Sequence, residues 1–441
     1  QERVAAGLLG RVSPWDPPMV VTGGPGVGKT VLSSSVARRA DVRRHFRDGI
    51  FWLPAGKDAT ERLPWLLEYL AVQLVLSSGA GETRANRLAN LGGARGKQDD
   101  EVEVELPWGV RGPREGEVAA FLAAHLATRG LTCLLVVDDL WDRESLDQVR
   151  DLGFHVMVTA NTKGQLWTQH GAGLAATLGS EVVAVDRMDD DECKLLLQRC
   201  SNLEDVDWDK LKESEPVKGI MKLCRYGPHS LVMVGSTLNG QAREFSWSST
   251  RDLMAMTIEG TRAALRNGGS QDQDYIALYS AGRVCIHKLP DHVRNRYMHL
   301  AILPRHVPAP EQMLESLWDT ESDEVFDEVL EKLRTQGLLQ PVTIMGDQGR
   351  SGHVTSNTQM DFILDSAAAE TVEHAAARMS LYLGRLKVLK SGLGRKAGGK
   401  YLAMGRCGLV SCWAEVEKRF GFTALEAYAD SIRAYRSAHE R

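Results

Sequence analysis

The segment from Gly23 to Thr30 constrains the fold of this chain more than any other. It reads Gly-Gly-Pro-Gly-Val-Gly-Lys-Thr and matches the pattern G-x-x-x-x-G-K-[ST] of phosphate-binding loops. An apolar run, Pro18 to Val21, precedes it, and a helical pattern from Val31 to Ala37 follows it. A strand, a glycine turn and a helix in this order place free N–H groups around an anion. The segment therefore predicts an α/β fold with a phosphate loop rather than an ordinary glycine turn.

The residues of this loop are expected to bind a nucleotide, ADP or ATP, together with Mg²⁺. Lys29 would reach the β- and γ-phosphates and assist catalysis, and the hydroxyl of Thr30 would bind Mg²⁺. Nucleotide contacts are expected from Gly24, Gly26, Val27, Gly28, Lys29, Thr30 and Val31.

A second part of the site is expected where the apolar run Leu134 to Val137 meets two aspartates. The run would deliver Asp138 to the carboxyl end of a strand, where it would hold Mg²⁺ through water. Asp139 stands where additional-strand ATPases place the base that orients the attacking water. Aspartate is shorter than the usual glutamate, so we expect slow catalysis. The alternative is a surface acidic pair at a strand end.

Apolar strands alternate with helical patterns in the first part of the chain. Strands are expected at 18–21, 49–53, 132–137, 154–159 and 181–185. This alternation predicts an α/β fold of the P-loop NTPase type, with a parallel five-stranded, additional-strand, AAA+-like sheet covered by helices. Ligands then lie at the carboxyl ends of the strands. There Thr159 and Asn161 are candidates for sensing the γ-phosphate, and a plain strand-end turn is the alternative.

The remainder of the chain is expected to form smaller, mostly helical domains. Three helices and two short β segments around 346–352 predict a winged helix. We expect a nucleotide-binding domain at 1–187 with an insertion at about 77–116, a helical domain at 188–245, a winged-helix domain at 270–365 and the start of a second helical domain at 366–441. We also expect the chain to be a central piece of a longer protein.

Composition argues against several classes of function. The net charge of −5 gives no general attraction for nucleic acid or membranes. No apolar run approaches the roughly 20 residues that span a bilayer. The seven cysteines are scattered without a C-x-x-C pair, which is typical of reduced thiols in a cytoplasmic protein. We therefore expect no membrane partner and no nucleic-acid partner.

Three segments carry a family resemblance: the loop Gly23 to Thr30, the second-strand segment Phe46 to Trp52, and Val136 to Trp141 with its Asp-Asp-Leu-Trp order. Together they resemble the NB-ARC-type STAND ATPases, the nucleotide-binding core of plant NLR disease-resistance proteins and of the animal apoptosome scaffold protein. The likeness covers nearly the whole chain. It implies an ADP/ATP-dependent switch in cell-death or innate-immune signalling, with weak ATPase activity at most.

Later motifs of this family match less well. Pro228 falls on the proline that packs against adenine, where Tyr226 replaces a glycine, although a helix-start proline is the alternative. Asn161 falls where the family has an arginine that senses the γ-phosphate, and asparagine lacks that charged fork. Ser356 falls where a histidine contacts the β-phosphate of ADP, with His353 as a second candidate. The resemblance therefore implies an intact phosphate grip with altered sensing.

The mechanism implied by the resemblance is a clamp. ADP would bridge the P-loop domain, the helical domain and the winged helix in a closed monomer. Exchange for ATP would favour an open form that self-associates into a ring. Signalling domains would lie on the missing flanks.

Two other functions are compatible with a phosphate loop. A DNA-associated ATPase with a winged helix, such as a replication initiator or transcriptional regulator, needs a basic recognition helix. The third helix expected in the winged domain, Glu321 to Arg334, is acidic and should repel DNA. A small-molecule kinase would leave the helical and winged domains unexplained.

Overall fold

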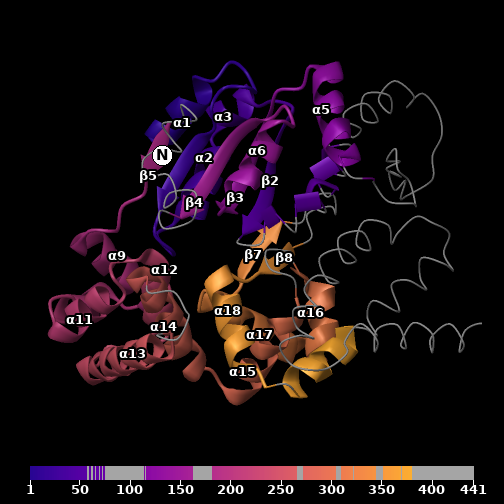
Figure 1. Cartoon of the computed structure of the whole chain (residues 1–441). Helices are drawn as coiled ribbons and strands as arrows, with labels where there is room; N and C mark the ends of the chain where they lie inside the picture. The colour runs from indigo at the N-terminus through magenta and orange to yellow at the C-terminus, as the bar shows by residue number, and fades with distance from the viewer. Residues whose placement is uncertain are drawn as a thin grey trace, which may run out of the picture.

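The computed structural model describes most of the chain. The described residues are 1–56, parts of 59–74, 114, 116–161, 181–265, 272–303, 309–320, 322–343, 351–368 and 370–379. The insertion expected at about 77–116 and most of the second helical domain expected at 366–441 lie outside the described residues. Within them, a domain built on a parallel sheet stands beside a body of helices that contains a small antiparallel sheet (Figure 1).

A parallel five-stranded sheet forms the centre of the first domain. Its strands are β1 Met19–Gly23, β2 Gly49–Gly56, β3 Cys133–Leu140, β4 His155–Asn161 and β5 Val182–Ala184. Their spatial order is β2-β3-β4-β1-β5. Strand β4 therefore lies between the loop strand β1 and the aspartate strand β3. This inserted strand is the feature that defines the additional-strand P-loop fold, so the predicted fold class is confirmed.

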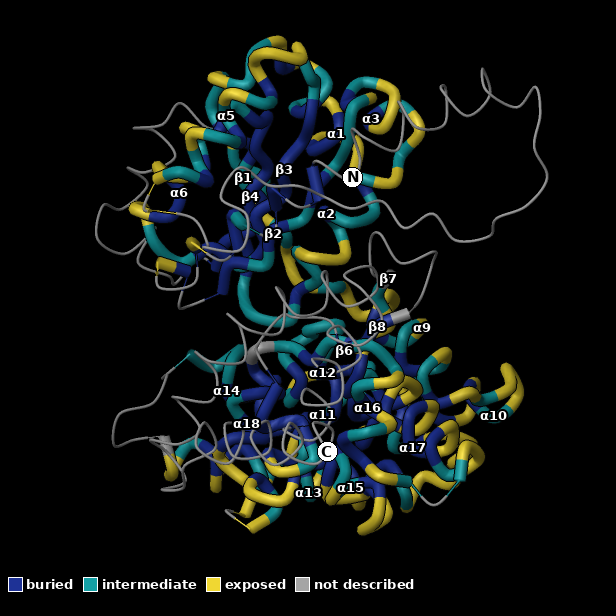
Figure 2. The backbone as a smooth tube through the Cα atoms, turned by 90° about the vertical axis from the view of Figure 1, so that its right-hand side faces the viewer, coloured by how far each residue is buried: buried dark blue, intermediate teal, exposed yellow. Residues whose placement is uncertain are grey.

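The sheet is buried on both faces because its central strands are apolar at consecutive positions. In β3, Leu134 and Val136 belong to one core, whereas Leu135 and Val137 belong to the opposite core. The covering helices are α1 Glu2–Leu9, α2 Lys29–Ala37 and α3 Ala40–His45 on the first face, and α5 Glu117–Arg129 and α6 Arg143–Arg150 on the second. Figure 2 shows β3 and β4 as largely buried and the outer turns of several helices as exposed. The carboxyl edge of the sheet is thereby left for ligands.

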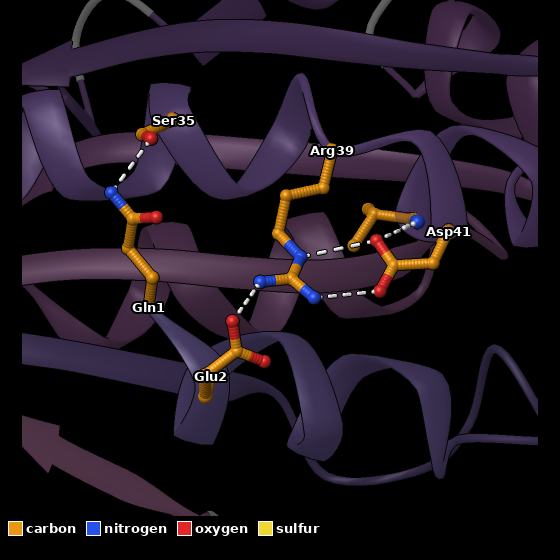
Figure 3. Close-up of polar contacts among 6 residues, drawn as sticks. Gln1, Glu2, Ser35, Arg39 and Asp41 are labelled. Atoms are coloured by element: carbon orange, nitrogen blue, oxygen red, sulfur yellow. Dashed lines mark hydrogen bonds and ion pairs between the residues drawn. The ribbon is translucent and has the colours of Figure 1, made fainter.

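Polar contacts fix α1 against α2 and α3 (Figure 3). The Arg39 guanidinium donates to Glu2 Oε1 at 2.5 Å and to Asp41 Oδ2 at 2.8 Å, while Gln1 Nε2 donates to Ser35 Oγ at 2.9 Å. The hydrogen bond from Arg39 lowers the pKa of Asp41 to about 2. Because these groups remain accessible to water, the contacts orient α1 more than they stabilise it.

The chain continues from the sheet into a helical region. Its helices are α9 Asp190–Ser201, α10 Asp205–Leu211, α11 Glu215–Leu223, α12 Pro228–Ser236 and α13 Glu244–Leu265. Helices α11 and α12 are separate because Arg225 and Tyr226, between them, have φ values of +54° and +57°. Helix α13 was not predicted. It extends the helical region 20 residues beyond position 245 (265 minus 245).

Helices and a three-stranded antiparallel sheet follow. They are α14 Gln273–His287, α15 Asp291–Met298, the short 3₁₀ helix η2 His299–Ile302, β6 Ala309–Pro310, α16 Glu311–Trp318, α17 Asp323–Thr335, β7 Gln340–Thr343, β8 Ser351–Val354 and α18 Asn357–Ser366. The β segments expected in the winged domain are present as the antiparallel pair β7 and β8. One hydrophobic core runs from α9 to α18 and beyond, and α14 packs against α12, α13 and α18. The division of the chain into domains remains a proposal.

None of the described helices combines the length and the apolar character needed to cross a membrane.

Candidate nucleotide-binding site

The phosphate loop connects β1 to α2 through two glycines in the left-handed region. Gly26 has φ +72° and Gly28 has φ +98°, values that side chains other than glycine rarely adopt. Gly28 is also the N-cap of α2. The loop therefore curls back over the first turn of α2, where unpaired N–H groups and the positive end of the helix dipole favour an anion.

Lys29 is folded back over this loop. Its Nζ donates to the carbonyl of Gly23 at 3.1 Å and to that of Gly24 at 2.8 Å. Burial lowers the pKa of Lys29, and the charges of Asp139 and Asp138 partly oppose that shift. A partly buried ammonium held by carbonyl oxygens is well suited to pair with phosphate, so these residues fit a nucleotide.

Asp138 lies at the carboxyl end of the sheet, as predicted, and joins the loop helix to β4. Its carboxylate accepts from Thr30 Oγ1 at 3.0 and 3.1 Å and from Thr159 Oγ1 at 2.6 Å. The residue is only 7% exposed, and this burial raises the pKa of Asp138 to about 6. A hydroxyl and a carboxylate oxygen in contact are the hard ligands that Mg²⁺ prefers, so Thr30 and Asp138 fit the predicted metal site.

Strand β3 has a bulge at its two consecutive aspartates. Val137 pairs with Val158 and Leu140 with Ala160 on β4, so Asp138 and Asp139 share the single partner position of Thr159. Asp139 takes a left-handed φ of +58°, and its N–H donates to Thr159 Oγ1 at 2.8 Å. Bulges of this kind re-aim side chains next to functional sites. Thr159, proposed from the sequence as a phosphate sensor, thus binds both aspartates.

The side chain of Asp139 makes a second contact outside the sheet. Trp141 Nε1 donates to Asp139 Oδ1 at 2.9 Å. The indole therefore fixes the orientation of the carboxylate expected to act as the catalytic base. The sequence pattern contained this tryptophan but gave it no physical role.

Asn161 is the last residue of β4 and lies beside the loop. It pairs with Gly23 at the end of β1 and is 7% exposed. The inserted strand therefore ends in a neutral residue, paired with the strand that leads into the phosphate loop.

Helix α12 meets the loop with its N-terminal end. The N–H of His229 donates to the carbonyl of Gly26 at 3.2 Å, and a Cβ placed on Gly28 would lie 4.0 Å from Cγ of Pro228. Pro228 is thus at the site, whereas His229 was missed by sequence reasoning. Its Nε2 is buried without a hydrogen-bond partner, and burial lowers the pKa of His229. The sequence signal that could have identified His229 is its position directly after Pro228.

Helix α14 also lies on the loop. A Cβ on Gly26 would come within 3.2 Å of Leu278 Cδ2, and a Cβ on Gly24 within 2.9 Å of Asp274 Oδ2. The loop, α12 and α14 therefore converge on the predicted site.

Ser356 makes its hydrogen bonds at the start of α18. It caps α18, where its hydroxyl accepts from the N–H of Gln359 at 3.4 Å, and Gln359 Nε2 donates to the carbonyl of Gly337 at 3.0 Å. His353, the other candidate, is 2% exposed in β8. Burial lowers the pKa of His353, and the charges that act on it come from Glu311 and Arg334. These contacts do not place either residue on the loop.

Several known proteins are similar in sequence to this chain. The NB-ARC domain family matches residues 2–207. Apoptotic protease-activating factor 1 of Homo sapiens is 22% identical over 322 residues, which cover 73% of this chain and 22% of that protein. The probable disease resistance protein RF9 of Arabidopsis thaliana is 19% identical over 308 residues, which cover 68% of this chain and 25% of that protein. The chain thus spans about a quarter of the length of these relatives.

Among solved structures, the ORC1 protein of Aeropyrum pernix in complex with DNA matches with a TM-score of 0.32 and 14% identity, covering 87% of this chain and 92% of that chain. A TM-score this low does not inform on function. The family match coincides with the segment that holds β1 to β5, the phosphate loop and the paired aspartates. Residues 2–207, just under half of this chain, therefore match the NB-ARC domain family.

Proposed function

We propose that this chain is a nucleotide-controlled switch that binds Mg-ADP or Mg-ATP between the phosphate loop, α12 and the winged-helix domain. The observation that carries the proposal is the convergence at Gly26. Its carbonyl accepts from the N–H of His229 of α12, and a Cβ built on Gly26 would lie 3.2 Å from Cδ2 of Leu278, in α14 within the proposed winged-helix range 270–365. A nucleotide held on this loop lies at the junction of all three parts, so its phosphates can bias their arrangement.

The proposed roles follow from the geometry of the loop. Its N–H groups and Lys29 hold the phosphates, while Thr30 and Asp138 hold Mg²⁺. The bound Mg²⁺ would neutralise phosphate charge. Val31 is 70% exposed at the start of α2 and, with Pro228, offers an apolar surface for the base. Gly24, Gly26, Val27 and Gly28 contribute loop backbone, and Asn161 lies where a γ-phosphate would be read.

Hydrolysis is proposed to be slow. Asp139 would orient the attacking water, but its carboxylate is held by Trp141 and is one methylene shorter than glutamate. Slow hydrolysis would suit a switch, because the ATP-bound state would then persist.

The proposed biological role is nucleotide-dependent self-association into a ring during cell-death or immune signalling. Its support is the relatives' printed names, an apoptotic protease-activating factor and disease resistance proteins. Further signalling domains on the flanks of this segment are part of the proposal.

The nucleotide carried through purification tests the function. We expect stoichiometric ADP in the denatured wild-type protein, measured by chromatography, and none in Lys29→Ala. Lys222→Ala, which changes an exposed lysine of α11, is the matched control and should retain ADP. We also expect light scattering to show a mass increase with Mg-ATP only. An empty wild-type site that also fails to take up Mg-ADP would refute the proposal.

A further inference from the structure

Asp274, near the start of α14, joins three separate segments of the chain. Its carboxylate accepts from Arg187 Nη2 at 2.8 and 3.0 Å, and from Arg225 Nε. Arg187 lies in the connection from β5 to α9, and Arg225 lies in the turn from α11 to α12. The Asp274 side chain is 16% exposed, against 44% for Arg187 and 36% for Arg225. The acid is thus the more buried partner of both pairs.

The same carboxylate rests on the phosphate loop. A Cβ on Gly24 would lie 2.9 Å from Asp274 Oδ2, so the acid touches the loop backbone. Leu278, one turn further along α14, approaches Gly26 in the same way. The first turns of α14 therefore cover the loop, and the two ion pairs hold that end of the helix in place.

The turn that presents Arg225 is strained. Arg225 has a φ of +54°, which is uncommon for a residue with a side chain. Such a conformation persists only where its surroundings maintain it. The bond to Asp274 is one contact that does so, together with the N–H of Arg225, which donates to the carbonyl of Lys222 at 3.0 Å.

The two arginines also stabilise the charged form of Asp274. Burial alone would raise the pKa of Asp274, but hydrogen bonds and charges from Arg225 and Arg187 lower it overall. The group is therefore ionised at neutral pH, and an isolated carboxylate at this place would repel a nucleotide. With both arginines paired to it, the Asp274 carboxylate can lie against the loop without repelling the nucleotide.

We propose that Asp274 is an interdomain latch that holds α14 against the phosphate loop through Arg187 and Arg225 and thereby slows the release of bound nucleotide. Movement of α14 relative to both the β5–α9 connection and the α11–α12 turn would break both pairs. The effect on release rests on the proposed nucleotide switch, whereas the latch contact itself does not.

The test compares Asp274→Asn with Glu213→Gln. Glu213 also accepts from two cations, Lys194 and Lys218, but its pairs lie between α9 and α11 and do not touch the loop. Both substitutions remove one negative charge and keep the side-chain shape. A difference between the two variants is therefore due to where the charge lies in the structure. Arg187→Gln, at a half-exposed residue, is the second variant and keeps the test decisive should Asp274→Asn fail to fold.

Two measurements are made on each variant. Hydrogen exchange of the nucleotide-free protein should be faster at 23–30 and 273–280 in Asp274→Asn and Arg187→Gln, and unchanged there in Glu213→Gln. Release of fluorescently labelled ADP, followed by stopped flow, should be about 10-fold faster in Asp274→Asn and about 3-fold faster in Arg187→Gln, a size typical of partly exposed charge pairs.

The outcomes separate the two proposals. A wild-type protein that binds no labelled ADP refutes the nucleotide switch, while hydrogen exchange still decides the latch contact. Equal exchange at 23–30 in Asp274→Asn and Glu213→Gln overturns the latch. Faster exchange with an unchanged release rate also overturns it, since the latch is proposed to govern release.

Discussion

Replacing Thr159 by valine tests whether the β4 hydroxyl organises the two aspartates of β3. Thr159 is fully buried, and valine has nearly the same shape. The change removes the 2.6 Å bond to Asp138 and leaves the Asp139 N–H without its 2.8 Å acceptor. An unmade hydrogen bond of a buried group costs about 1–3 kcal/mol. We therefore expect Thr159→Val to destabilise the nucleotide-free sheet domain by about 2–4 kcal/mol, or about 5–10 °C in Tm.

The pH dependence of this loss has a definite sign. The folded pKa of Asp138, about 6, lies above its ordinary value of 3.8. The folded protein therefore binds more protons than the unfolded chain between these values, and this group lowers stability as pH rises through that window. Thr159 donates to the carboxylate, so its removal should raise the pKa further. The difference between the two proteins should be larger at pH 7.5 than at pH 5.

The assay is thermal unfolding of nucleotide-free protein at both pH values, with Thr159→Ser as control. Serine keeps the hydroxyl and loses only a methyl group, so it should retain most of the stability. A valine variant within about 0.5 kcal/mol of the wild type, or one that loses no more than the serine variant, would refute the reasoning.

Three further predictions concern chemistry and backbone. Asp139→Asn should retain Mg-ATP binding but lose phosphate release by more than about 10-fold; equal hydrolysis by both proteins would exclude Asp139 as the base. Calorimetry should show Mg-dependent ADP affinity falling below about pH 6, because protonated Asp138 is a poor Mg²⁺ ligand, and Asp138→Asn should abolish this pH dependence. Gly260→Ala, in α13 with nothing within 4 Å of the new Cβ, should stabilise the protein by about 0.5–1 kcal/mol in urea unfolding; a loss of stability would contradict the open position.

The sheet could be predicted from the sequence because its signals are local. Buried parallel strands are continuous apolar runs, and the loop pattern specifies its own strand, turn and helix. The bulge at Asp138 and Asp139 could not be predicted, because it depends on the register between β3 and β4. The strand was therefore expected to end at Val137, whereas it continues to Leu140.

Helix α13 shows a different limit of sequence reasoning. Its buried residues Trp247, Met254 and Ile258 lie at helical spacing, but serines and threonines between them gave the stretch the composition of a loop. Packing against α11 and α14 makes it a helix, which is tertiary context overriding local propensity. His229 is similar, since only the fold brings it to Gly26.

The charges around the loop bear on how the site can hold a polyanion. Several charged groups of the described residues lie on or near the loop. The carboxylates are Asp138, Asp139, Asp272 and Asp274, and the cations are Lys29 and the two arginines that pair with Asp274, Arg187 and Arg225. In this set the carboxylates outnumber the cations by one (four minus three). Attraction for phosphate then depends on the N–H groups at the start of α2 and on a divalent cation at Thr30 and Asp138. The Asn161 amide adds no charge to this balance, in contrast to an arginine at the same strand end. Nucleotide affinity should therefore depend steeply on Mg²⁺, and Asn161→Arg should weaken that dependence. Equal Mg²⁺ dependence in wild type and Asn161→Arg, measured by titration of labelled ADP with and without chelator, would refute this reasoning, because a positive charge at position 161 would then add nothing to the attraction for phosphate.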